Sequence, residues 1–260
     1  MSDHEGIWIE VGDGVARVVL DHQPSRNSLD LATIDHLFAV FDALGSRSDA
    51  DVIVLGHEGP AFSAGHDLRE MTDRDLAFYE ELFDRCTVLM QTLHTLPQPV
   101  IARVDGVATA AGCQLVASCD LVVASDRSTF ATPGVRIGLF CSTPMVALSR
   151  SIGAKRALQM LLTGEPVDAA TAADWGLVNT VVAPDALIPT VDELTRQLRQ
   201  FSPHTIGLGK RAFYEQIELS ESAAYDHTRD VMSRNAADPV AAEGIRAFLD
   251  KRDPAWPPPS

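Results

Sequence analysis

The sequence predicts an α/β fold with one main domain and a smaller helical segment behind it. Apolar runs with strand character alternate with segments of helical spacing up to about residue 145. Beyond that point helical segments predominate, and one strand candidate remains at 178–184. Strands that alternate with helices are typical of parallel sheets with helical crossover connections. A chain of 260 residues has room for one large domain with a small appendage.

The first predicted elements are a hairpin and a helix. The runs 7–11 and 15–21 flank a Gly-Asp-Gly turn at 12–14, which is typical of a β-hairpin. Residues 29–45 have helical apolar spacing and end at a glycine, so a helix is expected there.

The remaining elements follow the same criteria of apolar spacing and breaker residues. Strands are predicted at 51–57, 99–106 and 120–126, and helices at 74–95 and from about 112. Helical segments are predicted at 154–162, 168–174, 186–200, 203–217, 221–236 and 240–250. We therefore expect a strand-rich core over 1–200 and a helical C-terminal segment over 201–260.

Charge, apolar run length and cysteine spacing indicate which ligands, metal sites and cellular locations to expect. The net charge of −15 argues against a nucleic-acid partner and against binding to an anionic membrane surface. No apolar run reaches about 18 residues, so no membrane insertion is expected. The four cysteines form no CxxC pair and no zinc-type cluster, which predicts reduced thiols and no metal site. Because the N-terminus lacks an apolar signal core and an Arg-rich transit pattern, the sequence predicts a cytoplasmic protein.

Two turns rich in small residues each follow a predicted strand. The first runs through Ser-Ala-Gly-His at 63–66, and the second runs through Ala-Ala-Gly at 110–112 into a helix. Backbone N–H groups at such positions are free to donate to a ligand oxygen, and two that converge form an oxyanion hole. Each turn alone is compatible with simple close packing. Their joint appearance, about 45 residues apart, favours a binding function.

These segments resemble a known family. "AFSAGHDLREM" (61–71) and "DGVATAAGCQLVASCDLVVASDRSTFATPGVRIGLF" (105–140) are similar to the crotonase (enoyl-CoA hydratase/isomerase) superfamily. The resemblance extends over nearly the whole chain, through "RNSLD" (26–30), "LLTGEPVDAATAADWGLVNTVV" (161–182) and "EGIRAFLDKRDPAW" (243–256). It implies a spiral of ββα units followed by a helical trimerisation region.

The resemblance also implies a site. The ligand would be an acyl-CoA thioester, and the oxyanion-hole donors would be the backbone N–H groups of His66 and Ala111. The residues expected to bind substrate are Asp67, Leu68, Arg69, Gly112, Cys141, Lys210 and Phe213. No separate cofactor is expected, since the substrate itself carries coenzyme A. The expected assembly is a homotrimer or a dimer of trimers.

The sequence departs from the family at two catalytic positions. Members that hydrate enoyl-CoA resemble each other in two glutamates, and the corresponding residues here are Gln114 and Gly134. Neither exchanges a proton at neutral pH, whereas a general acid or base contributes about 10²–10⁴ in rate. We expect Gln114 to hold a water or ligand oxygen and Gly134 to leave room in the site. The His66 ring is a candidate replacement for the missing groups.

The sequence thus predicts an enzyme of enoyl-CoA hydratase type that stabilises a thioester enolate but lacks both expected glutamates. Other acyl-CoA chemistry remains open, namely decarboxylation, isomerisation or thioester hydrolysis. Decarboxylation generates the enolate without a base. A non-catalytic acyl-CoA-binding protein is the third possibility.

Overall fold

The main sheet has six strands. The computed structural model describes residues 6–257. Its strands lie in the order β1-β2-β3-β5-β7-β10, and only the β1–β2 pair is antiparallel among the described strands of this sheet. Their bounds are β1 Ile7–Gly12, β2 Gly14–Leu20, β3 Ala50–His57, β5 Val100–Val104, β7 Leu121–Ser125 and β10 Thr180–Val182. The predicted hairpin and the α/β class are confirmed.

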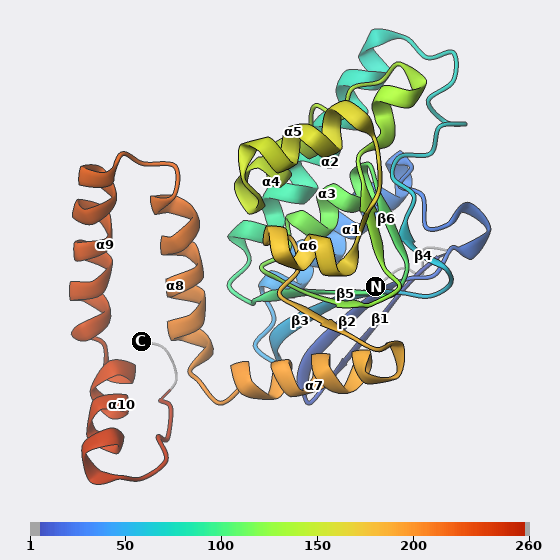
Figure 1. Ribbon diagram of the computed structural model, residues 1–260. Helices are drawn as coiled ribbons and strands as arrows, with labels where there is room; N and C mark the ends of the chain where they lie inside the picture. The colour runs from blue at the N-terminus through green and yellow to red at the C-terminus, as the bar shows by residue number, and fades with distance from the viewer. Residues whose placement is uncertain (1–5, 258–260) are drawn as a thin grey trace.

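A second sheet of four very short strands completes the spiral. It has the order β4-β6-β8-β9, with bounds β4 Ala61–Ser63, β6 Val107–Thr109, β8 Thr129–Ala131 and β9 Val167–Asp168. Strands β3 and β5 of the main sheet are each followed by a short strand of the second sheet and then by a helix, α2 and α3 respectively. This is the ββα repeat that the family resemblance implies (Figure 1).

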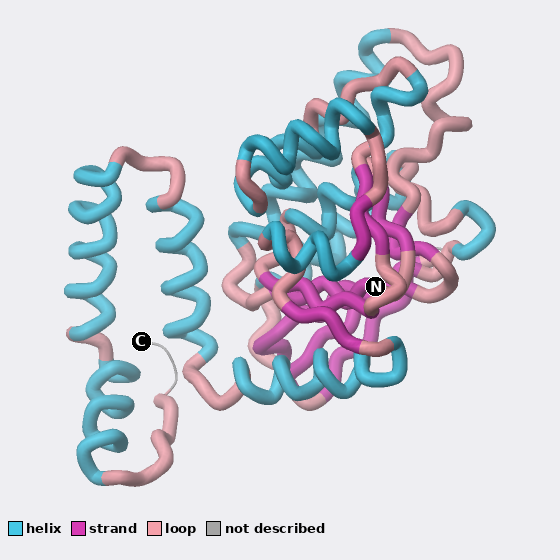
Figure 2. The backbone as a smooth tube through the Cα atoms, viewed as in Figure 1, coloured by secondary structure: helices cyan, strands magenta, loops and turns pink. Residues whose placement is uncertain are grey.

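The helices divide between the core and a separate group. Those around the sheets are α1 Leu31–Gly45, α2 Leu76–Thr95, α3 Ala111–Ala117, α4 Pro144–Ser151, α5 Ala154–Thr163, α6 Ala169–Trp175 and α7 Leu187–Leu198. Helices α8 Pro203–Gln216, α9 Glu221–Ala236 and α10 Pro239–Asp250 stand to one side of the core (Figures 1 and 2). Short 3₁₀ turns cover Gln23–Ser25, Pro133–Ile137 and Pro184–Ala186.

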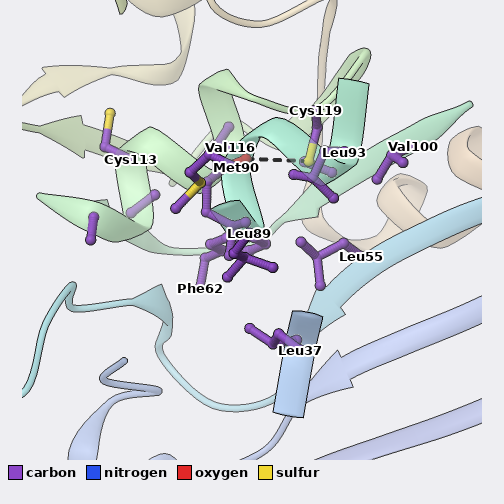
Figure 3. Packing of buried hydrophobic residues seen from close by; sticks show 14 of the residues in the cluster. Leu37, Leu55, Phe62, Leu89, Met90, Leu93, Val100, Cys113, Val116 and Cys119 are labelled. Atoms are coloured by element: carbon purple, nitrogen blue, oxygen red, sulfur yellow. Dashed lines mark hydrogen bonds between the residues drawn. The ribbon is translucent and has the colours of Figure 1, made fainter. Parts of the chain in front are cut away.

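Apolar packing covers both faces of the main sheet. The larger core fills the space between the sheet and α1, α2 and α3, and Leu37, Leu55, Phe62 and Leu89 are among its fully buried side chains (Figure 3). On the opposite face, α7 places Leu187 and its neighbours against the strands. Burial of a large aliphatic or aromatic side chain contributes about 1.5–3 kcal/mol, so these layers hold the turns at the strand ends in place.

The C-terminal helices leave much apolar surface open in the single chain. Tyr225, Met232, Phe248 and Leu249 are each at least 67% exposed. Apolar area of this extent on neighbouring helices is typical of a surface that contacts another protein. The predicted oligomerisation role of 201–260 is compatible with this surface and stays a prediction.

The sequence missed the short elements. Four strands of two or three residues each were not predicted, namely β4, β6, β8 and β9. Helix α4 was not predicted either. Alternation cannot be recognised over three residues, so these strands are defined only by their pairing, which is parallel for β4–β6 and β6–β8 and antiparallel for β8–β9. No helix in the part of the chain that the structure describes is long and apolar enough to cross a membrane.

The last residue of strand β3 is a buried histidine. His57 is 5% exposed, and its Nε2 accepts a hydrogen bond of 2.9 Å from the backbone N–H of Asp105. Burial, with the nearby Arg103 guanidinium, lowers the pKa of His57 from 6.5 to about 4. The folded protein therefore holds the ring neutral at pH values where the unfolded chain protonates it.

We expect this ring to make stability depend on pH. Its contribution is complete above about pH 6.5, and it is lost as the pH falls towards 4, because the unfolded state then binds the extra proton. The full loss is on the order of 3 kcal/mol. Urea unfolding between pH 7.5 and 4.5 measures it, and the wild-type advantage over His57→Gln should shrink as the pH falls. The exposed His22→Gln is the control, and an equal pH slope in wild type and His57→Gln would contradict the account.

Candidate active site

The first small-residue turn is fixed by a backbone bridge. The Leu29 N–H donates to Gly65 O at 2.8 Å, and the Asp67 N–H donates to Leu29 O at 3.3 Å. Leu29 therefore pairs with His66 in a parallel bridge. Because successive N–H groups of an extended segment point to opposite sides, the His66 N–H points away from Leu29.

Asn27 fixes the segment that contains Leu29, the bridge partner of the first turn. It is 3% exposed, its φ is +54°, and its side chain makes three hydrogen bonds. Nδ2 donates to Glu58 O at 3.1 Å and to Ala61 O at 2.8 Å, while Oδ1 accepts from the His22 N–H at 2.7 Å. The sequence offered only the resemblance of the "RNSLD" segment as a signal for this positioning role.

The second turn packs directly on the first. Ala110 has φ +53° and ψ −120°, a conformation rarely adopted by residues other than glycine, and α3 begins at the next residue. A Cβ on Gly65 would lie 3.1 Å from the Ala111 nitrogen, and a Cβ on Gly112 would lie 2.4 Å from Ser63 O. The two turns therefore meet backbone to backbone, and a side chain at either glycine would separate them.

This contact brings together two segments that the sequence placed about 45 residues apart. Ala111 is the first residue of helix α3. Its N–H therefore has no acceptor within the helix, because the first backbone N–H groups of a helix have no preceding helical carbonyl to bond. The geometry is compatible with two N–H groups that donate to one oxygen. The roles of His66 and Ala111 as donors stay predictions.

The His66 ring is neutral and largely enclosed. Nδ1 lies 3.3 Å from Leu29 O, and the ring meets Phe83 edge-on with centroids 5.4 Å apart. Nε2 is buried without a hydrogen-bond partner among residues 6–257. Burial lowers the pKa of His66, so the ring is uncharged at neutral pH.

Gln114 lies one turn into α3, on the wall of a cavity. Its side chain is 4% exposed, and Oε1 is buried with no hydrogen-bond partner in the described chain. The cavity measures about 610 Å³ and lies between α2, α3, α4 and α8. That volume is within the range of small-molecule sites, and an unpaired buried acceptor favours a ligand or water that donates to it.

The expectation that Gly134 leaves room in the site is wrong. A Cβ there would lie 2.1 Å from Leu139 O and 2.8 Å from the Cys141 sulfur. The Leu139 N–H also donates to Gly134 O at 2.9 Å, which fixes the turn against the glycine. The space of the expected glutamate is therefore filled by residues 138–141, and Cys141 is a packing partner of Gly134.

The loop after His66 remains accessible. Asp67 Oδ1 accepts a hydrogen bond of 2.8 Å from the Arg69 N–H. This bond stabilises a non-helical turn at 68–70. Leu68 is 52% exposed, and Arg69 is also exposed. Their predicted contact with the substrate is sterically open and stays a prediction.

Lys210 is engaged inside the protein. Its Nζ donates to Leu93 O at 2.7 Å and to Gln98 O at 2.8 Å, and it lies 2.6 Å from Asp120 Oδ2. These three acceptors use all the donors of the ammonium group, and the side chain is only 7% exposed. The structure therefore favours a structural role for Lys210 over the predicted contact with CoA. Phe213, by contrast, is 53% exposed and lines the cavity.

The cysteines are buried and unpaired. Burial raises the pKa of Cys86 and of Cys113 to about 12, so both thiols stay protonated at neutral pH. Within residues 6–257, no group of three or more His, Cys, Asp or Glu side chains is placed to hold a metal ion.

The crowding at Gly134 can be measured directly. Gly134→Ala should lower the free energy of unfolding by about 1–3 kcal/mol, because the new Cβ must displace the Leu139 carbonyl. Gly12→Ala is the matched control, since its Cβ meets nothing within 4 Å, and a change within about 0.5 kcal/mol is expected. Chemical denaturation of both variants tests this, and equal stability would show that the turn yields freely.

Comparison with known proteins places the chain in a family. A sequence model described as "Enoyl-CoA hydratase/isomerase" matches residues 10–258. The mouse protein named enoyl-CoA hydratase domain-containing protein 3, mitochondrial, is 44% identical over 247 residues, which cover 94% of this chain and 82% of the mouse protein. The segments "TAAGCQLVASCD" (109–120), "FATPGV" (130–135) and "GLFCSTP" (138–144) resemble the same subgroup.

The predicted cytoplasmic location is wrong by this comparison. The relatives from mouse, rat, Xenopus laevis, human and zebrafish are all named mitochondrial proteins. The prediction depended only on the absence of a recognisable targeting pattern, and the names of these relatives contradict it.

Solved structures agree with the sequence match. The enoyl-CoA hydratase of Mycobacterium smegmatis superposes with a TM-score of 0.95 at 44% identity, over 97% of this chain and 99% of that one. Human enoyl-CoA hydratase domain-containing protein 3 superposes with a TM-score of 0.94 at 43% identity, over 97% and 100%. The predicted crotonase-like fold is confirmed, and the chain belongs to the enoyl-CoA hydratase/isomerase family.

Proposed function

We propose that the protein binds acyl-CoA thioesters and stabilises the oxyanion of a thioester enolate at the meeting point of the two turns. The backbone N–H groups of His66 and Ala111 donate to the thioester oxygen. The observation behind the proposal is the close packing of Gly65 on the Ala111 nitrogen, with the His66 N–H directed away from its bridge partner Leu29. Removal of one donor of such a pair typically costs about 10²–10³ in rate.

Proton transfer in this site is weak. Hydration needs one group that takes a proton from water and one that protonates the α-carbon. Gln114 can orient a water but cannot deprotonate it, and the space at Gly134 is filled by Leu139 and Cys141. The His66 ring, the candidate replacement, is neutral and its Nδ1 faces Leu29 O. Slow hydration is therefore the expected activity.

Decarboxylation of an acyl-CoA with a carboxylate on the α-carbon is the second candidate. The bond between the α-carbon and the carboxylate breaks, carbon dioxide leaves, and the electron pair enters the enolate, which then takes a proton from water. Gln114 and Thr143, which line the cavity, are uncharged and so do not repel a substrate carboxylate. This reaction needs an oxyanion hole and no strong base.

The exposed apolar side chains of α8–α10 support self-association. We propose that these helices join copies of the chain into a trimer or a dimer of trimers. Light scattering coupled to size-exclusion chromatography should give about three or six times the 28.0 kDa mass of the chain. A mass of one chain at micromolar concentration would refute the assembly.

The proposed chemistry predicts a gain of function. The wild-type protein should bind crotonyl-CoA and hydrate it with a kcat/KM below about 10⁴ M⁻¹s⁻¹, the lower end of common enzyme values. Gln114→Glu restores a carboxylate one turn from Ala111 and should raise hydration by about 10². Gln159→Glu adds the same charge to an exposed position on α5, outside the cavity, and should leave the rate unchanged.

Three results would contradict this account in different ways. Wild-type hydration in the common range would mean that another residue transfers the protons. Equal rates for Gln114→Glu and wild type would remove Gln114 from the chemistry. Absence of crotonyl-CoA binding would refute the proposed function itself.

A further inference from the structure

The cavity beside Gln114 has two chemically different ends. Gln114 lines the inner end one turn after Ala111, and the Ala110 N–H donates to Ala131 O, which holds the segment after β8 next to the start of α3. Cys141 of that segment touches Gly134, and Thr143, two residues later, lines the cavity with Gln114. The inner end is therefore next to the proposed position of the thioester.

The outer end lies at the other end of α3. Ser151 at the end of α4 donates to the carbonyl of Ala117, the last residue of α3, at 3.3 Å. His94 near the end of α2 stacks on Tyr214 of α8, with ring centroids 4.0 Å apart. From Thr87 to His94 the cavity follows seven residues of α2, which is about 10 Å at the helical rise per residue.

A carboxylate already occupies this outer end. Arg150 Nε donates to Glu218 Oε1 at 2.8 Å, and Arg150 Nη2 donates to Glu218 Oε2 at 3.3 Å. This is the two-point arrangement in which guanidinium groups recognise carboxylates. Both side chains line the cavity, and they are 49% and 58% exposed, so Glu218 has room to leave.

Of the acidic and basic side chains named at the outer end, Arg150 has the partner that a ligand can replace. Asp120 also lines this end, but it is balanced by Lys210 at 2.6 Å and receives a hydrogen bond from the Tyr214 hydroxyl at 2.8 Å. If a ligand carboxylate replaced Glu218 on Arg150, the guanidinium would keep one carboxylate partner, and the displaced Glu218 side chain, which is 58% exposed, would turn into solvent. Met90 lies between Thr87 and His94 on α2, and Val146 lies between Thr143 and Arg150, so these apolar side chains offer a surface for a carbon chain.

We propose that Arg150 forms a carboxylate subsite for the far end of the acyl group. The protein then selects acyl-CoA thioesters whose chain ends in a second carboxylate. This inference depends on the proposed function, because the thioester must lie next to Gln114. A span of about 10 Å is roughly nine single bonds of extended chain, which suits an acyl group of medium length.

Binding of two thioesters of equal length tests the subsite. The full-length protein is titrated by calorimetry with octanoyl-CoA and with the mono-CoA thioester of the eight-carbon dicarboxylic acid. Wild type should bind the dicarboxylic thioester about tenfold more tightly, the scale of a charge-assisted hydrogen bond partly open to water. Arg150→Gln should reduce that ratio to about one. Glu218→Gln should increase it, because the competing carboxylate is gone.

A matched control separates Arg150 from general charge effects. Arg196 makes a similar two-point pair with Glu193 on α7, away from the cavity, so Arg196→Gln should keep the wild-type ratio. Equal binding of the two thioesters by wild type would overturn the subsite and leave the proposed function standing. A ratio that survives in Arg150→Gln would also overturn it. Failure of both thioesters and of crotonyl-CoA to bind would overturn the proposed function as well.

Discussion

The close contact between the turn at 63–66 and the turn at 110–112 is the constraint on which the site depends. Gly65 and Gly112 permit it, because a Cβ at either position would meet backbone atoms of the other turn at 3.1 Å or less. The spiral supplies the two turns, since each follows a short strand of the second sheet. The short strands thus hold the two turns in contact, and the larger core keeps the strands in place.

The sequence predicted the long elements because their patterns are long. The apolar run of β3 and the periodicity of α2 each extend over eight or more residues, enough to define a period. The same reasoning failed for β4 and β6, which have three residues each and are strands only because they pair with each other. The missed elements include the strands that lead into the site, so the approach of the two turns could be inferred only from the family resemblance.

Side-chain environments were harder to predict than the backbone. Lys210 has the sequence context of a ligand-binding cation, yet its three donors are used by Leu93, Gln98 and Asp120. Gly134 suggested empty space, but Leu139 and Cys141 occupy it. A sequence shows which atoms are absent from a residue, while only the fold shows which neighbour takes their place. Arg150 gave no signal at all, because its partner Glu218 comes from a segment 68 residues away.

Helix α8 belongs both to the cavity wall and to the exposed apolar surface of the C-terminal helices. One side of it contributes Tyr214 to the cavity wall, and Glu218 follows just after its end. Other side chains of α8 and α9 form the open apolar surface of the C-terminal helices. In the proposed assembly, a second copy that docks on that surface would also set the position of the cavity wall. Ligand affinity and subunit association would then be thermodynamically coupled.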